Sequence, residues 1–277
     1  MRRIAFTLAG LLLVISAATA KAQETQPAAT MSVPVASYSQ ANCTGFIADT
    51  PVPHDLFVLG GADDDFHSVV RQFVKGESIF ISQRNGGQLA VGADYNVVRP
   101  VKDLFATMHY QGEGGDIGKL GMPYADVAQV KVTHVNPDGV VAKITFSCEA
   151  IVPGDTLVPF QPRAIPDYTV SKPLDHFAPL DQNKAHGRIT ASRNNFGSFG
   201  EGTVVYLDLG EKDSQPGKRF RIYKVLPPET TGFLSGKSTP PETIGEAVVL
   251  SVNSKSSVAL VVSSYREIAA GDHIEAE

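Results

Sequence analysis

The densest group of side chains that could do chemistry is Asp63-Asp64-Asp65, followed by His67. Carboxylates and imidazoles are donor types that bind divalent cations. Three consecutive aspartates cannot all face one site on a regular element, because neighbouring side chains of a helix or strand point in different directions. We therefore interpret the cluster as a solvated loop in which one of the last two aspartates caps a short helix over residues 66–73.

Two glycine-containing motifs resemble catalytic or nucleotide-binding signatures only in part. A nucleotide-binding glycine loop follows a strand and opens a helix, whereas residues 112–118, which contain G-x-G, have polar surroundings and indicate a flexible loop. Residues 197–200 lack the G-x-S-x-G spacing of a nucleophile elbow. The seven histidines are dispersed, without H-E-x-x-H or H-x-x-E-H spacing. We therefore predict no catalytic residue, no cofactor and no metal ligand, and expect a protein that is not an enzyme.

The first 22 residues are typical of a secretory signal peptide. Two arginines follow Met1, an apolar stretch covers residues 8–18, and Ala20-Lys21-Ala22 supplies small residues for cleavage between Ala22 and Gln23. The apolar stretch is shorter than the roughly 20 residues of a transmembrane helix. An uncleaved N-terminal anchor is the alternative. We expect a periplasmic or secreted protein without an integral membrane span after cleavage.

The charge balance bears on the class of partner. The chain has 277 residues, 43% of them hydrophobic, with 24 basic and 29 acidic side chains and a net charge of -5. Removal of residues 1–22 leaves 21 basic and 29 acidic side chains, a net charge of -8. This composition can fill a core, and an acidic chain argues against a nucleic-acid partner.

The expected export of the protein bears on the state of its two cysteines. In an oxidising compartment Cys43 and Cys148 are an even pair, so a disulfide between them is the default. The alternatives are two buried free thiols or a catalytic thiol, but no base near Cys148 in the sequence suggests a nucleophile. A disulfide would tie the segment around Cys43 to the first of the two repeats described next.

Composition divides the chain into five parts. Residues 1–22 form the signal peptide, and residues 23–40, which are small and polar, are expected to be a flexible leader. Residues 41–160 hold an N-terminal segment and a first repeat, and residues 186–277 hold a second repeat. Between them, residues 161–185 contain four scattered prolines, which disfavour regular structure and indicate an extended linker.

The two sides of this linker contain the same unit. Glycines, alternating apolar positions and spacing agree in three pairs of blocks, two at an offset of 125 and one at 117. The pairs are residues 78–81 with 203–206, 92–99 with 217–224, and 130–155 with 247–272. The last pair closes on Gly154-Asp155 and Gly271-Asp272, which we interpret as a turn with a glycine at positive φ and an aspartate bonded to the local backbone.

Each unit is expected to be all-β. Short β-branched and aromatic runs are separated by glycine turns. Residues 219–224 are one such run, in which side chains alternate with a period of two. Four or five such strands favour a small closed barrel, which leaves no exposed edge. Longer segments at about 100–126 and 226–243 are our first choice for partner contacts. The basic side chains, Arg84, Arg99, Lys218, Arg219, Arg221 and Lys224, are expected on the solvated side of the strands.

This pattern resembles a known family. Residues 217–224, G-K-R-F-R-I-Y-K, a variable loop, a strand pair and the closing 268–272, I-A-A-G-D, are similar to the C-terminal domain of the flagellar H-ring assembly protein; 92–99 and 151–155 form the first copy. Related repeats occur in other exported bacterial envelope proteins. The resemblance implies two tandem small SH3-like β-barrels with no known catalytic role.

These observations predict an exported, non-catalytic envelope protein that binds or scaffolds partners in the periplasm or at the outer membrane. The partners we expect are envelope proteins or peptidoglycan. The alternative is a secreted hydrolase or carbohydrate-active protein with a site between the repeats. That alternative requires a pocket that gathers a histidine with carboxylates from both units.

Overall fold

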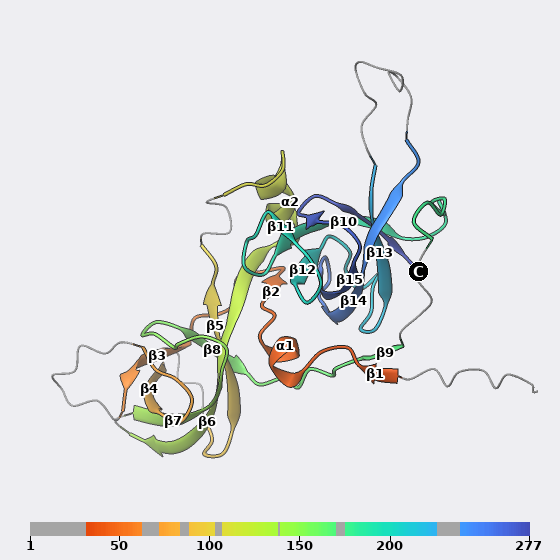
Figure 1. Cartoon of the computed structure of the whole chain (residues 1–277). Coiled ribbons are helices and arrows are strands. Elements are labelled where there is room, and N and C mark those ends of the chain that lie inside the picture. Colours follow the sequence, from red (N-terminus) through yellow and green to blue (C-terminus); the bar gives the residue numbers. More distant parts are fainter. Residues whose placement is uncertain are drawn as a thin grey trace, which may run out of the picture. The chain divides into compact units, whose positions relative to one another are not determined.

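The computed structural model describes residues 32–62, 72–83, 89–102, 107–137, 139–169, 175–225 and 239–277 (Figure 1). The expected signal peptide with its cleavage site Ala22–Gln23, the aspartate cluster at 63–65 and His67 lie outside the described residues. So does most of the helix expected at 66–73. Its last position, Phe73, forms an isolated antiparallel bridge with Ile151.

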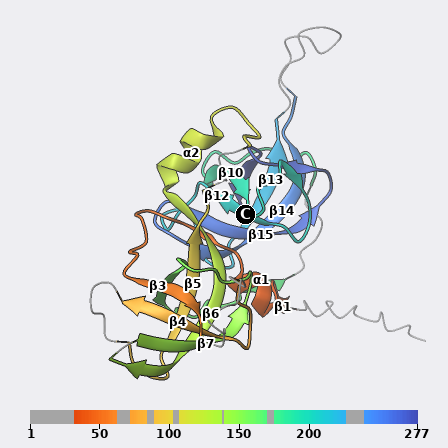
Figure 2. The ribbon, with the colours of Figure 1, turned by 90° about the vertical axis from the view of Figure 1, so that its left-hand side faces the viewer.

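The fold is mainly β and contains two closed barrels, as the repeated strand pattern predicts (Figures 1 and 2). Each barrel has six strands, where the pattern indicates four or five. In the first barrel the neighbouring strands are β3 (Leu56–Gly61), β4 (Ser78–Gln83), β7 (Gly139–Ser147), β6 (Met122–Asn136), β5 (Asp94–Pro100) and β8 (Thr156–Pro159). In the second they are β10 (His186–Ser192), β12 (Val204–Leu207), β15 (Ser257–Ser264), β14 (Glu242–Val252), β13 (Arg219–Lys224) and β17 (His273–Ala276). Every pairing in these barrels is antiparallel.

The remaining described elements are short. Strand β2 (Phe46–Ala48) adds to β6, β1 (Ser32–Pro34) pairs with β9 (Asp167–Thr169), and β11 (Ser198–Phe199) pairs with β16 (Ile268–Ala269). The helices are α1 (Tyr38–Asn42) and α2 (Glu113–Leu120). With five and eight residues, these two described helices fall well short of an apolar span across a membrane.

The two barrels have one topology, which supports the duplication. The Gly92 amide donates to the Val132 carbonyl at 2.8 Å, and the Gly217 amide donates to the Val249 carbonyl at 2.8 Å. These bonds are equivalent at the offsets of 125 and 117 read from the sequence. The duplication is therefore visible in the hydrogen-bond ladder as well as in the residues.

One of the three block alignments is wrong by a single residue. Ile79 pairs with Ala142, and Val205 pairs with Ala259, so the equivalent of Ile79 is Val205 at an offset of 126. A slip of one residue moves every side chain to the other face of a strand. The correct register puts the fully buried Ile79 and Val205 in equivalent positions inside their barrels.

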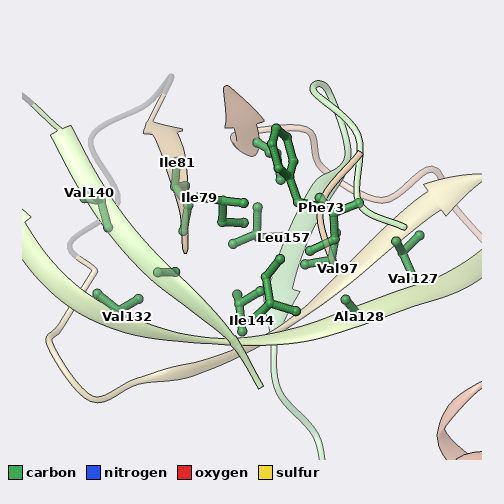
Figure 3. Close-up of a cluster of buried hydrophobic side chains, with 14 of the residues drawn as sticks. Phe73, Ile79, Ile81, Val97, Val127, Ala128, Val132, Val140, Ile144 and Leu157 are labelled. Atoms are coloured by element: carbon green, nitrogen blue, oxygen red, sulfur yellow. The ribbon is translucent and has the colours of Figure 1, made fainter. Parts of the chain in front are cut away.

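Alternating side chains fill each barrel separately. In the first, Ile79, Val97, Val132, Ile144 and Leu157 come from five different strands and are at most 3% exposed (Figure 3). The second barrel has its own cluster, which includes Val205, Phe220, Ile222, Ala259 and Ile274. Each repeat therefore has a hydrophobic core of its own. Closure of each barrel also leaves no unpaired strand edge.

Two segments expected to be irregular contain regular structure. Residues 32–42, which overlap the expected leader at 23–40, form β1 and α1, and residues 167–169 of the expected linker form β9. Helix α1 begins after a capping box in which Ser37 and Gln40 bond each other's backbone. A five-residue helix is too short to produce a visible period, so the sequence pattern missed it.

The prediction of a flexible loop at residues 112–118 is wrong, because most of this stretch belongs to helix α2. Glycine is a poor helix former, but Ile117 and Leu120 are buried on the inner side of α2. The Asp116 carboxylate also pairs with the Lys119 ammonium at 2.8 Å. Tertiary packing therefore overrides the local preference.

Candidate functional site

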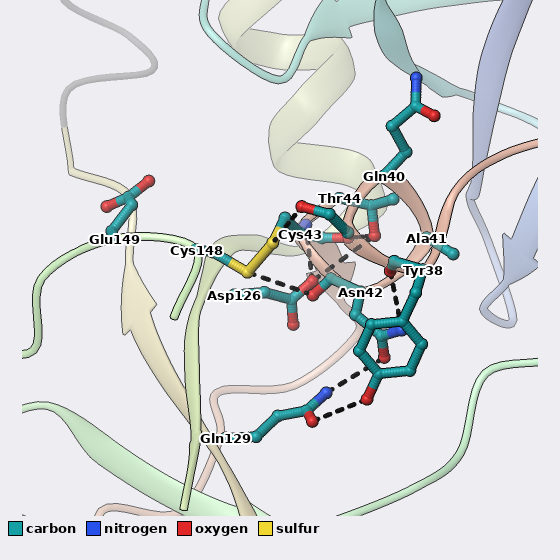
Figure 4. The surroundings of a disulfide bond; sticks show 12 residues. Tyr38, Gln40, Ala41, Asn42, Cys43, Thr44, Asp126, Gln129, Cys148 and Glu149 are labelled. Carbon is teal, nitrogen blue, oxygen red and sulfur yellow. Dashed lines mark hydrogen bonds between the residues drawn. A yellow bond between two sulfur atoms is a disulfide. The ribbon is translucent and has the colours of Figure 1, made fainter. Parts of the chain in front are cut away.

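The predicted disulfide between Cys43 and Cys148 is confirmed, with the two Cα atoms 5.5 Å apart (Figure 4). Cys43 caps the C-terminus of α1 and donates its amide to the Ser39 carbonyl. Cys148 directly follows β7. The bond therefore fastens the N-terminal segment to the first barrel, as we expected.

Beside the disulfide lies a buried ion pair. Asp126 on β6 is 6% exposed, and its carboxylate accepts hydrogen bonds from the Arg163 guanidinium at 2.6 and 2.8 Å and from the Gly45 amide at 2.8 Å. Arg163 also donates to the Thr44 hydroxyl at 2.9 Å. Residues from three parts of the chain thus share one polar network.

The second barrel contacts the same segment. The Tyr206 hydroxyl donates to the Thr44 carbonyl at 2.9 Å, and the side-chain amide of Asn253 donates to the Ile47 carbonyl at 3.0 Å. Burial raises the pKa of the Tyr206 phenol above its ordinary value, so it stays a protonated donor. A third hydrophobic cluster joins α1, α2 and β2 to the outer side of the second barrel; it includes Ala41, Ile47, Ile117, Leu120, Tyr206, Leu250 and Leu260.

A cleft of about 770 Å³ opens next to this junction. Both barrels line it, together with residues that flank their strands. Its cations are Arg99, Lys102 and Arg193, and its carboxylates are Glu149 and Asp155. The other lining residues are Pro100, Val101, Ala125, Val152, Pro153, Gly154, Asn194, Asn195 and Tyr206.

One side of the cleft is a rigid ion pair at the closing turn of the first repeat. The Arg99 guanidinium donates to both oxygens of Asp155 at 2.7 Å, and the Val152 amide donates to the same carboxylate at 2.8 Å. The hydrogen bonds to Asp155 raise the pKa of Arg99 above its ordinary value. This pair fixes the position of the Arg99 side chain through its Nε and Nη2 atoms and leaves the Nη1 atom facing Glu149.

The equivalent turn of the second repeat repeats this arrangement in a weaker form. The Ala269 amide donates to the Asp272 carboxylate at 2.7 Å, and the Lys224 ammonium lies 3.5 Å from it. The glycines before the two aspartates, Gly154 and Gly271, both have a φ of 93°. The interpretation of Gly-Asp as a structural turn is confirmed.

Glu149 lies between two arginines from opposite sides of the cleft. One of its oxygens is 3.4 Å from the Arg99 Nη1 atom, and the other is 3.7 Å from the Arg193 Nη2 atom. The Glu149 side chain is 42% exposed, against 3% for Asp155. In Figure 4 its carboxylate points away from the disulfide. Glu149 is therefore the loosely held carboxylate of the cleft.

A tight turn after β10 positions Arg193. Its backbone amide donates to the Val204 carbonyl at 2.9 Å, and the Phe196 amide closes the turn on the Ser192 hydroxyl at 2.7 Å. Asn195 takes a positive φ of 53°, which asparagine tolerates, and the His109 Nε2 atom lies 3.0 Å from its carbonyl. These contacts hold the backbone of the second wall.

Sequence reasoning found only part of this cleft. Arg99 and Asp155 were singled out, as a basic strand residue and as a turn aspartate. Glu149 and Arg193 were missed, because nothing local marks them and they meet only when the barrels pack. The expectation that Arg221 lies on a solvated face is wrong, since it is 6% exposed and pairs with Glu275.

Other chemistry has less support from the described residues. Among them, no group of three or more His, Cys, Asp or Glu side chains is placed to hold a metal ion. The described lining of the cleft contains no histidine, and both its carboxylates come from the first barrel and its closing turn. Comparison of the chain with protein-family models and with curated proteins finds no match.

Proposed function

We propose that this protein is an exported, non-catalytic component of the bacterial cell envelope. In this proposal it binds a partner, an envelope protein or peptidoglycan, in the periplasm or at the outer membrane. The signal-like N-terminus, the disulfide and the resemblance to SH3-like envelope repeats support export and a scaffold role. The cleft between the barrels is the proposed contact site.

The observation that carries the proposal is the charge of the cleft. Three cations line it, while one of its two carboxylates, Asp155, is already saturated by Arg99 and a backbone amide. The protein as a whole is acidic. A cationic cleft on an acidic chain favours a specific anionic group over general electrostatic attraction.

Binding fits the cleft better than hydrolysis does. A general acid or base must reach the reacting atoms with a free hydrogen-bonding site. Asp155 faces Arg99, and Glu149 faces two guanidinium groups. The alternative of a secreted hydrolase or carbohydrate-active protein places its site between the repeats and requires a histidine together with carboxylates from both repeats. The described lining of the cleft contains no histidine, and both its carboxylates belong to the first repeat.

The experiment uses the full chain, exported by its own N-terminus in a bacterial host. A photo-crosslinking residue replaces Lys102 in the cleft or, as a control, Lys143, an exposed residue of β7. We expect the mature protein to begin at Gln23 in an envelope fraction and to crosslink a defined species from Lys102 only. Retention in the cytoplasm, or equal crosslinking from both positions, would overturn the proposal.

A further inference from the structure

We infer that the cleft binds a short peptide through its free terminal carboxylate, which takes the place of Glu149 between Arg99 and Arg193. The inference rests on the proposed function of the cleft as a binding site. It adds the chemical group that the site recognises. Peptide carboxylates are present on both expected partners, as protein C-termini and as the peptide stems of peptidoglycan.

The geometry of Glu149 supports this group. Its two oxygens face one guanidinium each, at 3.4 and 3.7 Å, so the space between the arginines already accommodates a bridging carboxylate. Both contacts are longer than the 2.7 Å bonds from Arg99 to Asp155. Ion pairs of such length and exposure contribute little to stability. A ligand carboxylate can therefore displace Glu149 at a small cost.

Arg193 has unused capacity. Its side chain is 29% exposed, and in the described part of the chain its guanidinium has Glu149 as its only carboxylate, at 3.7 Å. A guanidinium carries five N–H donors in a planar fork that matches a carboxylate. The turn around Ser192 holds the backbone of Arg193, so the binding of an anion need not reorganise this wall.

The charge of the cleft favours the entry of a carboxylate. With Glu149 turned outward, Arg99, Lys102 and Arg193 face only Asp155 inside the cleft. Arg99 and Asp155 neutralise each other, so the charges of Lys102 and Arg193 remain, and an incoming carboxylate would compensate one of these two. A neutral ligand in the place of Glu149 would leave the Arg193 guanidinium without its carboxylate partner.

The rest of the lining suits a peptide chain. Asn194 and Asn195 add polar side chains to the lining, and its small apolar residues, Pro100, Val101, Ala125, Val152 and Pro153, suit short side chains such as alanine. The volume of about 770 Å³ lies in the range of small-ligand sites. A peptide of a few residues would fill it.

The test is calorimetric titration of the oxidised, mature protein. The probes are tri-L-alanine, its C-terminal amide, and an L-Ala-D-Ala-D-Ala tripeptide with a free carboxylate. We expect a free acid to bind at least tenfold more tightly than the amide. A preference for the D-alanine acid would assign the source to peptidoglycan, and a preference for the L-acid to a protein C-terminus.

Variants separate recognition from folding. Arg193→Ala should weaken binding of the free acid by tenfold or more, whereas the control Arg266→Ala, an exposed arginine paired with Glu242, should not change it. Glu149→Gln should tighten binding, because it removes the competing carboxylate, and a damaged fold cannot produce that gain. Equal binding of acid and amide, weaker binding by Glu149→Gln, or no binding of any probe would overturn the inference. If crosslinking from Lys102 persists in that case, the proposed function stands without it.

Discussion

The Arg163 guanidinium donates hydrogen bonds to both carboxylate oxygens of Asp126, at 2.6 and 2.8 Å, although the two residues belong to different parts of the fold. Asp126 is a residue of β6 in the first barrel, and Arg163 lies in the proline-rich segment between the barrels. Their side chains are 7% and 19% exposed. The start of the expected linker is therefore fixed in place by a buried ion pair.

We predict that Arg163→Met lowers the free energy of unfolding by about 3 kcal/mol, because it leaves the Asp126 carboxylate buried without its charge partner. Urea unfolding followed by circular dichroism measures this. The double variant Arg163→Met, Asp126→Asn should lose less than the sum of the two single variants. Strict additivity would show that the two side chains are not coupled.

Removal of the disulfide should be the most costly change at the junction. It closes a loop with a sequence separation of 105 residues between Cys43 and Cys148. In the chain-entropy model a loop of about this length contributes roughly 4–5 kcal/mol. We expect Cys43→Ala, Cys148→Ala to lose several kcal/mol in urea unfolding, and the reduced wild type to match it. A loss below about 1 kcal/mol would contradict the prediction.

The two repeats supply a matched pair of aspartates. Asp155 accepts three hydrogen bonds, two of them from Arg99, while Asp272 accepts one backbone bond and has Lys224 at 3.5 Å. Since hydrogen bonds to charged groups contribute about 1.5–3 kcal/mol each, Asp155→Ala should destabilise the protein more than Asp272→Ala. Thermal unfolding of both variants side by side tests the order, and the reverse order would refute it.

The glycines of the same turns form a second matched pair. A β-carbon at Gly154 would meet nothing within 4 Å, whereas one at Gly271 would lie 3.1 Å from the Tyr110 ring. Gly154→Ala should cost only the strain of a positive φ, about 1–2 kcal/mol. Gly271→Ala should cost at least about 1 kcal/mol more, because it also pushes against Tyr110. Equal losses in urea unfolding would mean that Tyr110 moves aside freely.

One histidine should make stability depend on pH. Burial, together with the charges of Arg188 and His186, lowers the pKa of His273 below its ordinary value of about 6.5. Below that pH the unfolded chain takes up a proton that the folded chain resists, so the free energy of unfolding falls as the pH falls. We expect His273→Asn to reduce this slope between pH 7 and 5. The control His134→Asn, at an exposed position, should keep the wild-type slope.

The barrels were predictable, because their signals are local. Alternating apolar residues and recurring glycine turns specify short strands, and the repetition of Gly154 and Gly271 confirms the unit. Within one block the register was still missed by a residue, since a run such as Val204–Leu207 is buried at every position and shows no alternation. Backbone pairing, and not pattern, decides the offset there.

The cleft was not predictable for the opposite reason. Its key side chains are far apart in the chain: Glu149 and Arg193 meet across two barrels, and His109 reaches the turn at Asn195. Helix α2 was missed because its glycines suggest a loop. The helix is stabilised by the packing of Ile117 and Leu120 on neighbouring elements. Such contacts depend on tertiary structure, which a single sequence does not display.

The disulfide also determines which strand of the first barrel is left outside the covalent loop. Strands β3 to β7 lie between Cys43 and Cys148, and β8 follows them. The β3–β8 ladder has a single registered pair, Phe57 with Thr156, against three pairs in the equivalent β10–β17 ladder. The first barrel should therefore open at β8, and the backbone amides of that strand should exchange their hydrogens with solvent sooner than those of β17.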